Sequence, residues 1–363
     1  MKNPFVNNIK VPVIALIVCC LFSACRQTQK TVPDNIDLKE LIEPVGTDNI
    51  FKTEGYYNWG GSIIKGQDGL YHLFYSRWKA EYKFTGWLLF SEVAYAISKT
   101  PSGPWEYKNT VLQGRGKGYW DAITAHNPKI KFFDGKYYLY YISSNLGERE
   151  DYTMEELIET SVTGYSHANW KILRPNQRTG VAVANSLNGP WERFDQPLIE
   201  PSGPITTLTV NPAVDKGADG RYYLIVKGDK PGTTKFIRNQ AIAISDNPDG
   251  PFVMQSKPVI DYMDTEDMSI WFDQSRQRFY GIFHSTEGFI GLVTSTDGVN
   301  WDKAYGYEGI PKIVPLDNGK VLKADRLERP FVYQEDGTLQ VLGVAAKKDD
   351  TSYIVFVPMK EKL

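Results

Sequence analysis

A strand–turn–strand unit recurs five times along the chain, and this repeat limits the fold more than any other feature. Each copy has an apolar strand, a short turn and an aromatic-rich second strand, and the turn contains Asp-Gly in four of the five copies. Asp-Gly between β-rich runs is a strong hairpin signal. The copies are Gly61–Trp78, Asn127–Ser144, Asn211–Gly228, Asp267–Ser285 and Arg329–Ala346.

A second pattern follows each unit and completes a sheet. It is an apolar strand, in four cases followed by a glycine-containing turn and an aromatic residue, and the copies are Val93–Glu106, Gly180–Phe194, Gln240–Val253, Ile290–Ala304 and Ser352–Pro358. One such sheet cannot bury both of its faces, whereas five packed around an axis can. The sequence therefore predicts an all-β fold, a five-bladed β-propeller of antiparallel blades around a central funnel, over residues 51–363. Because Trp105, Trp191 and Trp301 occupy equivalent turn positions, we expect them to pack between blades.

Composition narrows the possible partners. The formal net charge of the 363 residues is -2, which gives no electrostatic reason to expect binding to nucleic acid or to an anionic membrane surface. The 22 Tyr, 17 Phe and 9 Trp residues favour sheets and sugar-binding surfaces. We therefore expect no nucleic-acid partner, and we expect a monomer.

The N-terminus reads as an export signal. Lys2 and Lys10 precede the apolar run Ile14–Phe22, which is too short to cross a bilayer as a mature helix. Ser23 and Ala24 then precede Cys25, an arrangement that resembles the lipobox of bacterial lipoproteins. We expect residues 1–25 to be a signal peptide with Cys25 lipidated, 26–50 to be a tether and lead-in, and the chain to lie in the bacterial cell envelope, anchored in the outer membrane and facing the periplasm. An ordinary signal peptide with an incidental cysteine is the alternative.

The remaining cysteines support this interpretation. Cys19 and Cys20 also lie in the signal region, so the mature domain has neither disulfides nor a thiolate site. No sequence motif demands a metal or other cofactor. We predict none, although a cation bound in the channel is compatible with the fold.

The starts of the innermost propeller strands are expected to form the functional site, because they converge on one face of the channel. Proline follows three of them, and proline favours an extended conformation at the preceding residue. The positions are Asn58-Trp59-Gly60, His126-Asn127, Val210-Asn211, Glu266-Asp267 and Glu328-Arg329.

Carboxylates gather at these positions in the last two blades. Glu266 and Asp267 begin the fourth repeat, Glu328 begins the fifth, and Asp121 precedes the second. Glycoside cleavage needs one protonated and one ionised carboxyl group, and acids crowded in a funnel raise one another's proton affinity. Each acid taken alone could instead pair with a neighbour such as Arg329.

The other funnel residues suit substrate binding. Asn127, Asn211 and Arg329 could hold hydroxyls or an anionic substituent, while Trp59 and Trp120 could offer apolar faces to sugar rings. His126 could donate a proton or contact the substrate. His72 and His284 lie on second strands and are expected to be structural.

These motifs resemble the five-bladed glycoside hydrolase superfamily that includes families 43, 32 and 117. The resemblance covers nearly all of residues 51–363 and is most evident in the run from His126 to Tyr141, HisAsnProLysIleLysPhePheAspGlyLysTyrTyrLeuTyrTyr. The order of HisAsnPro, AsnPro, GluAsp and GluArgPro is closest to uncharacterised family-117-like proteins.

The resemblance implies site roles, with departures. In family 43 the general acid opens the fourth blade, which Glu266 matches. The family's base is an Asp in the first blade, where this chain has Asn58-Trp59-Gly60-Gly61, and its accessory Asp is replaced by Asn211. Either Asp121, Asp267 or Glu328 would then act as base, or the chemistry is altered. A histidine has been proposed as the acid of family 117, which keeps His126 as a candidate.

The sequence thus predicts an exo-acting glycoside hydrolase that trims oligosaccharides by general acid/base catalysis. A polysaccharide lyase is the first alternative. It needs a base and a charge-neutralising group at a uronate, and His126 with Arg329 could supply them. A non-catalytic sugar-binding propeller is the second, because the first-blade Asp is missing.

Overall fold

The computed structural model describes residues 1, 32–149, 151–233 and 236–360. Cys25 and the rest of the export signal lie outside the described residues, so lipidation and location stay predictions. Residues 32–363 form one compact unit. In the part of the chain that is described, no helix has the length and apolarity needed to cross a membrane.

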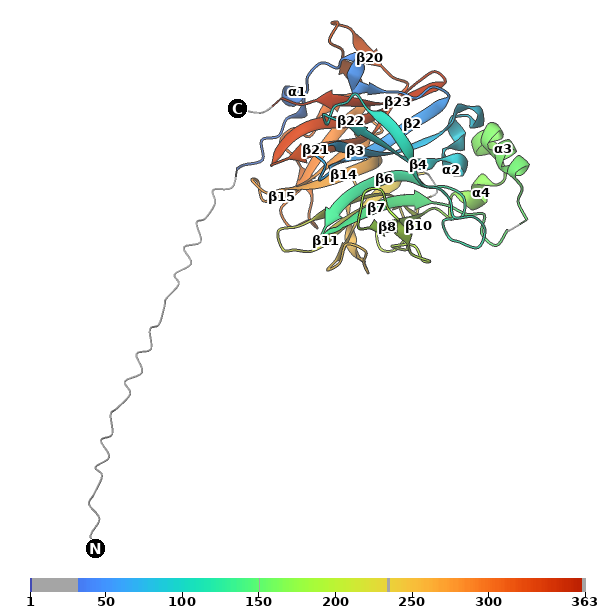
Figure 1. Ribbon diagram of the computed structural model, residues 1–363, viewed down its shortest axis with the longest axis horizontal. Coiled ribbons are helices and arrows are strands. Elements are labelled where there is room, and N and C mark those ends of the chain that lie inside the picture. The colour runs from blue at the N-terminus through green and yellow to red at the C-terminus, as the bar shows by residue number, and fades with distance from the viewer. Residues whose placement is uncertain (2–31, 150, 234–235, 361–363) are drawn as a thin grey trace. The chain divides into compact units, whose positions relative to one another are not determined.

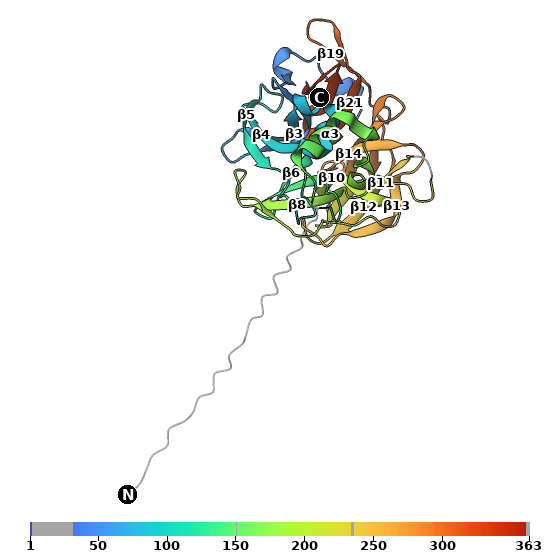
Figure 2. The ribbon, with the colours of Figure 1, turned by 90° about the vertical axis from the view of Figure 1, so that its right-hand side faces the viewer.

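Five antiparallel sheets follow one another along the chain and surround a common centre (Figures 1 and 2), which confirms the predicted five-bladed propeller. The first blade contains β2 (Tyr56–Lys65), β3 (Tyr71–Lys79), β4 (Glu92–Ser98) and β5 (Glu106–Leu112). The second contains β6 (His126–Phe133), β7 (Lys136–Ser143), β8 (Arg178–Ala184) and β9 (Glu192–Arg193). The third contains β10 (Thr206–Lys216), β11 (Tyr222–Asp229), β12 (Arg238–Ser245) and β13 (Val253–Ile260).

The last two blades carry additions at their edges. The fourth contains β14 (Thr265–Asp273), β15 (Arg278–Ser285), β16 (Phe289–Ser295) and β17 (Asp302–Lys303), with β18 (Ile310–Pro311) also paired to β16. A small hairpin follows, formed by β19 (Ile313–Pro315) and β20 (Val321–Lys323). The fifth contains β21 (Arg326–Glu335), β22 (Thr338–Lys348), β23 (Thr351–Pro358) and β1 (Ile50–Phe51).

The fifth blade closes the ring with a strand from the other end of the sequence. Ile50 of β1 pairs with Val355 of β23, so the blade's outer strand comes from near the N-terminus. The segment before β1 also packs on the domain. Its helix α1 (Leu38–Leu41) buries Leu38 and Leu41 in a cluster with side chains of the fourth and fifth blades. Residues 36–50, which belong to the predicted tether and lead-in of residues 26–50, therefore pack on the folded domain.

Aromatic packing joins neighbouring blades. Trp105 lies in the cluster shared by the first and fifth blades, Trp191 packs against the cluster of the first and second, and Trp301 against that of the third and fourth. These positions agree with the packing role predicted from their repetition.

Two insertions cover one end of the channel. The first carries the 3-10 turns η2 (Ala80–Tyr82) and η3 (Phe84–Gly86) and helix α2 (Trp87–Phe90). The second carries α3 (Met154–Thr163), η4 (Gly164–Ser166) and α4 (Trp170–Leu173), and the two insertions share a buried cluster that includes Leu89 and Leu157. Figure 2 shows α3 lying across the middle of the blades. The helices thus build a wall on one side of the funnel mouth.

Candidate active site

One backbone feature repeats at the same point of every blade. Where the innermost strand enters the channel, one residue has a positive φ between 53° and 63°, and the pairing to the second strand shifts register across it. Glycine, asparagine and aspartate tolerate this left-handed conformation better than other residues. We call the five residues the channel ring: Gly60, Asn127, Asn211, Asp267 and Arg329.

The ring corrects one prediction about the prolines. Asn127, Asn211 and Arg329 precede proline and were expected to be extended, but φ at these residues is 53°, 59° and 58°. The bulge at each position turns the backbone instead, and the proline falls where the ladder is already interrupted. A non-glycine left-handed residue costs free energy, so Arg329 is the ring member whose conformation is most strained.

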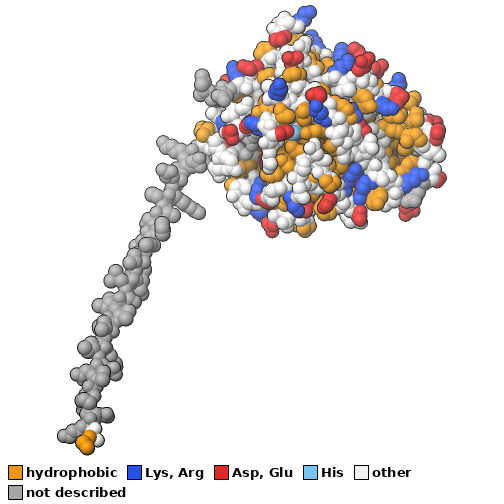
Figure 3. Space-filling model, viewed as in Figure 1, with side chains coloured by type: hydrophobic (Ala, Val, Ile, Leu, Met, Phe, Trp, Pro, Cys, Tyr) orange, Lys and Arg blue, Asp and Glu red, His pale blue; other side chains and the backbone are white. Residues whose placement is uncertain are grey.

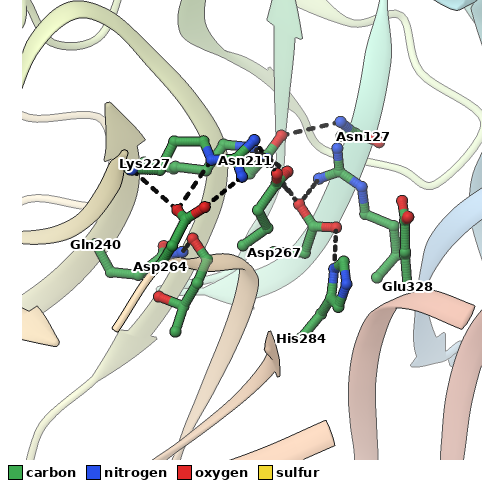
Figure 4. A network of polar contacts seen from close by, with 12 residues as sticks. Asn127, Asn211, Lys227, Gln240, Asp264, Asp267, His284 and Glu328 are labelled. Carbon is green, nitrogen blue, oxygen red and sulfur yellow. Dashed lines mark hydrogen bonds and ion pairs between the residues drawn. The ribbon is translucent and has the colours of Figure 1, made fainter. Parts of the chain in front are cut away.

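The ring side chains bind one another. Asn211 Nδ2 donates to Asp267 Oδ1 over 2.8 Å, and Arg329 Nη1 lies 3.1 Å from the same oxygen. The Asn127 amide either donates to Asn211 Oδ1 at 3.0 Å or, turned over, accepts from Arg329 Nη2 at 2.7 Å. Figure 4 shows these groups turned toward one another from neighbouring blades. Asn127 and Asn211 are both 4% exposed, so their first role is to hold the base of the funnel.

Asp267 is the negative centre of the ring. Its Oδ2 lies 3.6 Å from His284 Nδ1, and Lys227 Nζ lies 3.9 Å from its Oδ1. Burial acts to raise the pKa of Asp267, but Arg329, His284 and Lys227 outweigh it and hold that pKa well below its usual range. Asp267 is therefore a fixed carboxylate beneath the pocket. His284, predicted to be purely structural, belongs to this network.

A pocket of about 550 Å³ lies directly above the ring. The residue before each ring member lines it, so the five blades contribute equivalent positions: Trp59, His126, Val210, Glu266 and Glu328. This volume is within the range of small-ligand pockets. Glu266 and Glu328 thus share one cavity in adjacent blades.

The side of the pocket formed by the insertions is aromatic. Phe84, Trp87, Tyr165 and Trp170 line it together with Trp59. Trp59 packs edge-on against Phe84 with ring centroids 5.0 Å apart, and Trp87 Nε1 donates to the Tyr165 hydroxyl. Such faces suit the apolar sides of sugar rings. Trp59 is in the pocket as predicted.

The other side is charged, and Glu266 lies between two cations. Lys227 Nζ donates to Glu266 Oε2 over 2.7 Å, and Arg238 forms an ion pair with Oε1. Burial acts to raise the pKa of Glu266, but the charges of Lys227 and Arg238 dominate, and the net shift is downward. An ionised Glu266 does not fit the general-acid role that the sequence assigned to it.

Glu328 has the opposite surroundings. Within the described residues its carboxyl group accepts no hydrogen bond, and its nearest ion-pair partner is Arg326, 3.7 Å away. Burial, and next the negative charge of Asp267, raise the pKa of Glu328. Figure 4 draws no hydrogen bond or ion pair from its carboxyl group to the other residues shown. Glu328 is the carboxyl group of the site that is favoured to stay protonated.

His126 is buried between tryptophans. Its Nδ1 lies 2.7 Å from Ser91 Oγ, and its ring packs against Trp78 and Trp87. Burial, with the positive charge of Arg329, holds the pKa of His126 well below its usual value. A neutral imidazole is a poor acid, so the structure leaves His126 a wall residue of the pocket.

Two predicted site residues lie elsewhere. Asp121 is fully buried on the outer side of the second blade, where its carboxylate pairs with Arg115 and Arg193 and accepts from the Tyr141 hydroxyl. Trp120 stacks on Tyr141 and donates to the Phe194 carbonyl. Neither lines the pocket. Both predictions are wrong because these side chains contact residues at the outer strand β9 and not the pocket.

One group of ligands near the ring could hold a metal ion. Asp267, His284 and Glu328 each place a ligand atom within 4.8 Å of the others. Arg329 and Lys227 already supply positive charge to Asp267, however, which counts against a further cation. The fit is therefore poor, and no step below depends on a metal.

Two residues of the site were not predicted from the sequence: Lys227 was not singled out, and His284 was expected to be structural. Lys227 pairs across the sheet with Val210, and His284 with Glu266, so both lie on second strands opposite the residues that line the pocket. Aligning the repeats shows Ser76, Ile142 and Ala345 at the corresponding positions. At this position of the repeat, a lysine and a histidine stand where the other blades have small or apolar residues, and this difference could have identified them from the sequence.

Comparison with known proteins identifies the fold. No family model matches the chain, and no curated protein matches its sequence. Among solved structures, the protein BT0996 in an RGII complex has a TM-score of 0.61 at 16% identity, covering 90% of this chain and 94% of that one. A family 117 glycoside hydrolase of Zobellia galactanivorans has a TM-score of 0.58 at 17% identity, covering 88% of both chains. An α-L-arabinofuranosidase of Lactobacillus brevis has a TM-score of 0.55 at 16% identity, covering 90% and 95%.

The chain has the five-bladed propeller fold of these glycoside hydrolases. The predicted resemblance to families 117 and 43 is confirmed at the level of fold. At identities of 12–17% the match carries no information on the activity, which has to be argued from the pocket.

Proposed function

We propose that this protein is a glycoside hydrolase that removes sugars from the end of an oligosaccharide. One observation carries the proposal. Glu266 and Glu328 occupy equivalent positions in adjacent blades, face the same pocket, and have opposite electrostatic surroundings. Paired carboxyl groups whose surroundings separate their pKa values are the arrangement that glycoside cleavage uses.

The roles follow from the charges. Glu328 would protonate the departing glycosidic oxygen, because its raised pKa keeps a proton available. Glu266, ionised beside Lys227 and Arg238, would face the anomeric carbon as nucleophile or would orient water there. Asp267 would not touch the sugar. It would act on Glu328 through its charge.

The pocket walls would position the sugar. The ring of Gly60, Asn127, Asn211, Asp267 and Arg329 closes the base, which favours binding of a chain end. The aromatic wall would take the apolar face of the sugar and leave its polar groups toward the carboxylates.

The experiment is a screen of an oligosaccharide panel with wild type and Glu266→Gln. We expect the wild type to release a monosaccharide and the variant to be slower by about 10³-fold or more, since it lacks the ionised carboxylate. Anomer-resolved proton NMR of the first product then distinguishes a nucleophile from a water-orienting base. Equal rates for the two proteins would remove Glu266 from the mechanism.

A lyase is the main rival, and the same screen tests it. Elimination needs a base beside a uronate and gives an unsaturated product that absorbs in the ultraviolet. His126 was the sequence's candidate base, but its low pKa makes it a weak one. If the screen gives an ultraviolet-absorbing product and no hydrolysed sugar, the reaction is elimination and the protein is a lyase.

The pH dependence offers a second prediction. A general acid works while protonated, so activity should fall as pH rises through the raised pKa of Glu328. Asp267→Asn removes a charge that raises this pKa, and the alkaline limb of kcat/KM should move to lower pH. The surface variant Asp219→Asn, on the β10–β11 turn, should leave the limb in place. An alkaline limb that moves upward in Asp267→Asn would contradict the assignment.

A further inference from the structure

We infer that the substrate carries an anionic group, a carboxylate or sulfate ester, on a sugar next to the cleaved bond, and that Arg326 binds it. The inference rests on the proposed function and adds the substrate class to it.

Most of the pocket's cations already have ionised partners. Arg174 makes two hydrogen bonds to Asp229, at 2.7 and 2.5 Å. Arg238 pairs with Asp264, Lys227 with Glu266, and Arg329 with Asp267. These four cations and four carboxylates balance one another. They fix the geometry of the wall and leave no net charge for a ligand.

Two further cations line the pocket without such a partner. Lys171 of α4 has no ion pair or side-chain hydrogen bond among the described residues, and it is exposed. Arg326, at the start of β21, has Glu328 as its one ion-pair contact among the described residues, at 3.7 Å without a hydrogen bond. Its side chain is 45% exposed. The pocket therefore has an excess of positive charge, although the whole chain has a net charge of -2 and Figure 3 shows charges of both signs interspersed over the outer face in view.

Arg326 is the cation that a reacting sugar would meet. Its guanidinium group lies 5.5 Å from the centroid of the Phe84 ring, which lines the aromatic wall. It also adjoins Glu328, so an anion bound to it would lie close to the bond that Glu328 protonates. A guanidinium group with free N–H donors matches carboxylate and sulfate oxygens. Positive charge in a concave pocket also concentrates anionic ligands.

The test compares matched substrates. Uronate-containing oligosaccharides, their carboxyl-reduced neutral forms and sulfated oligosaccharides are assayed with wild type, Arg326→Met and Arg326→Lys. Lys347→Met is the control, because Lys347 also lies 5.5 Å from the Phe84 ring centroid but does not line the pocket. Each variant is compared at its own pH optimum, since Arg326 also acts on the pKa of Glu328.

The expected result is a selective loss. Arg326→Met should raise KM for the acidic substrate by about 10–100-fold, the size of a charged hydrogen bond, and leave neutral substrates within about 2-fold. Arg326→Lys should recover part of the loss, Lys347→Met should change little, and added NaCl should weaken binding of the acidic substrate. Preference for the uronate or the sulfated arm identifies the anion.

Two outcomes separate this inference from the proposed function. Hydrolysis of neutral and acidic sugars with equal kcat/KM, or an equal loss on both in Arg326→Met, would overturn the anionic substrate and leave the hydrolase intact. Salt-sensitive, Arg326-dependent binding of acidic oligosaccharides without cleavage of any bond would overturn the hydrolase and keep the anionic ligand.

Discussion

Replacing Glu328 with glutamine is expected to lower kcat on an oligosaccharide by about 10²–10⁴-fold. The amide keeps the size of the side chain but has no acidic proton for the departing oxygen. An alcohol leaves poorly without that proton, so the loss should fall on bond cleavage and not on binding. The measurement is kcat and KM on the best substrate of the panel, with thermal unfolding as a check on the fold.

The leaving group supplies the sharper control. A dinitrophenyl glycoside needs little protonation, so Glu328→Gln should retain most of its activity on that substrate, whereas Glu266→Gln should lose activity on both substrates. Glu308→Gln, on an exposed residue, should match the wild type on both. Equal losses for the two leaving groups in Glu328→Gln would show that Glu328 is not the acid.

The division of roles between these two carboxyl groups could not have been predicted from their place in the repeat. Glu266 and Glu328 hold the same position in successive blades, and the repeat alone predicts that they share the funnel. Their protonation depends on Lys227 from β11 and Arg238 from β12, which reach Glu266 and not Glu328. A pKa depends on the three-dimensional set of neighbouring charges, and the sequence gives only the register of each strand.

The errors at Asp121 and Trp120 have a different origin. Both precede His126 by a few residues and were assigned to the funnel because of that closeness. The innermost strand β6 begins only at His126, and the Asp121 carboxylate is held by Arg115 and by Arg193 of the outer strand β9. Alternating apolar residues specify strands and hence blades, but no such pattern specifies the path of a loop.

The insertions show the opposite case. Residues 79–92 and 145–178 are long connections between strands, and long ordered loops in compact domains are often functional. Their aromatic residues Phe84, Trp87, Tyr165 and Trp170 form one wall of the pocket. The length of the insertions is visible in the sequence, but the packing of one on the other that builds this wall is not.

Lys129 should make the stability of the protein depend on pH in an unusual direction. It lies in the channel on the far side of the ring from the pocket, beside a cavity of about 350 Å³. Its Nζ donates to Ser269 Oγ over 2.7 Å and to the Gly61 carbonyl over 3.2 Å, and no carboxylate of the described residues forms an ion pair with it. Burial, then the charges of Arg329 and Lys131, lower the pKa of Lys129 to about 7, against a partial opposing effect of Asp267.

The sign follows from proton binding. Between about pH 7 and the ordinary lysine pKa of 10.5, the unfolded chain holds a proton at residue 129 that the folded chain lacks. Stability rises with pH wherever the unfolded state binds more protons. Lys129→Met removes this dependence, and at pH 7 or below it also removes a charge that the fold must desolvate. The free energy of unfolding of the wild type minus that of Lys129→Met should therefore increase as pH rises through this window.

The expected gain is roughly 2–4 kcal/mol, less than the full shift implies because Lys129 is partly exposed and its charge is partly screened. Urea unfolding of wild type and Lys129→Met at a series of pH values measures it. Lys136→Met, on the exposed first residue of β7, is the matched control and should follow the wild type at every pH. Parallel profiles for wild type and Lys129→Met would mean that the folded channel keeps Lys129 charged, and that its hydrogen bonds to Ser269 and Gly61 compensate for the missing counter-ion.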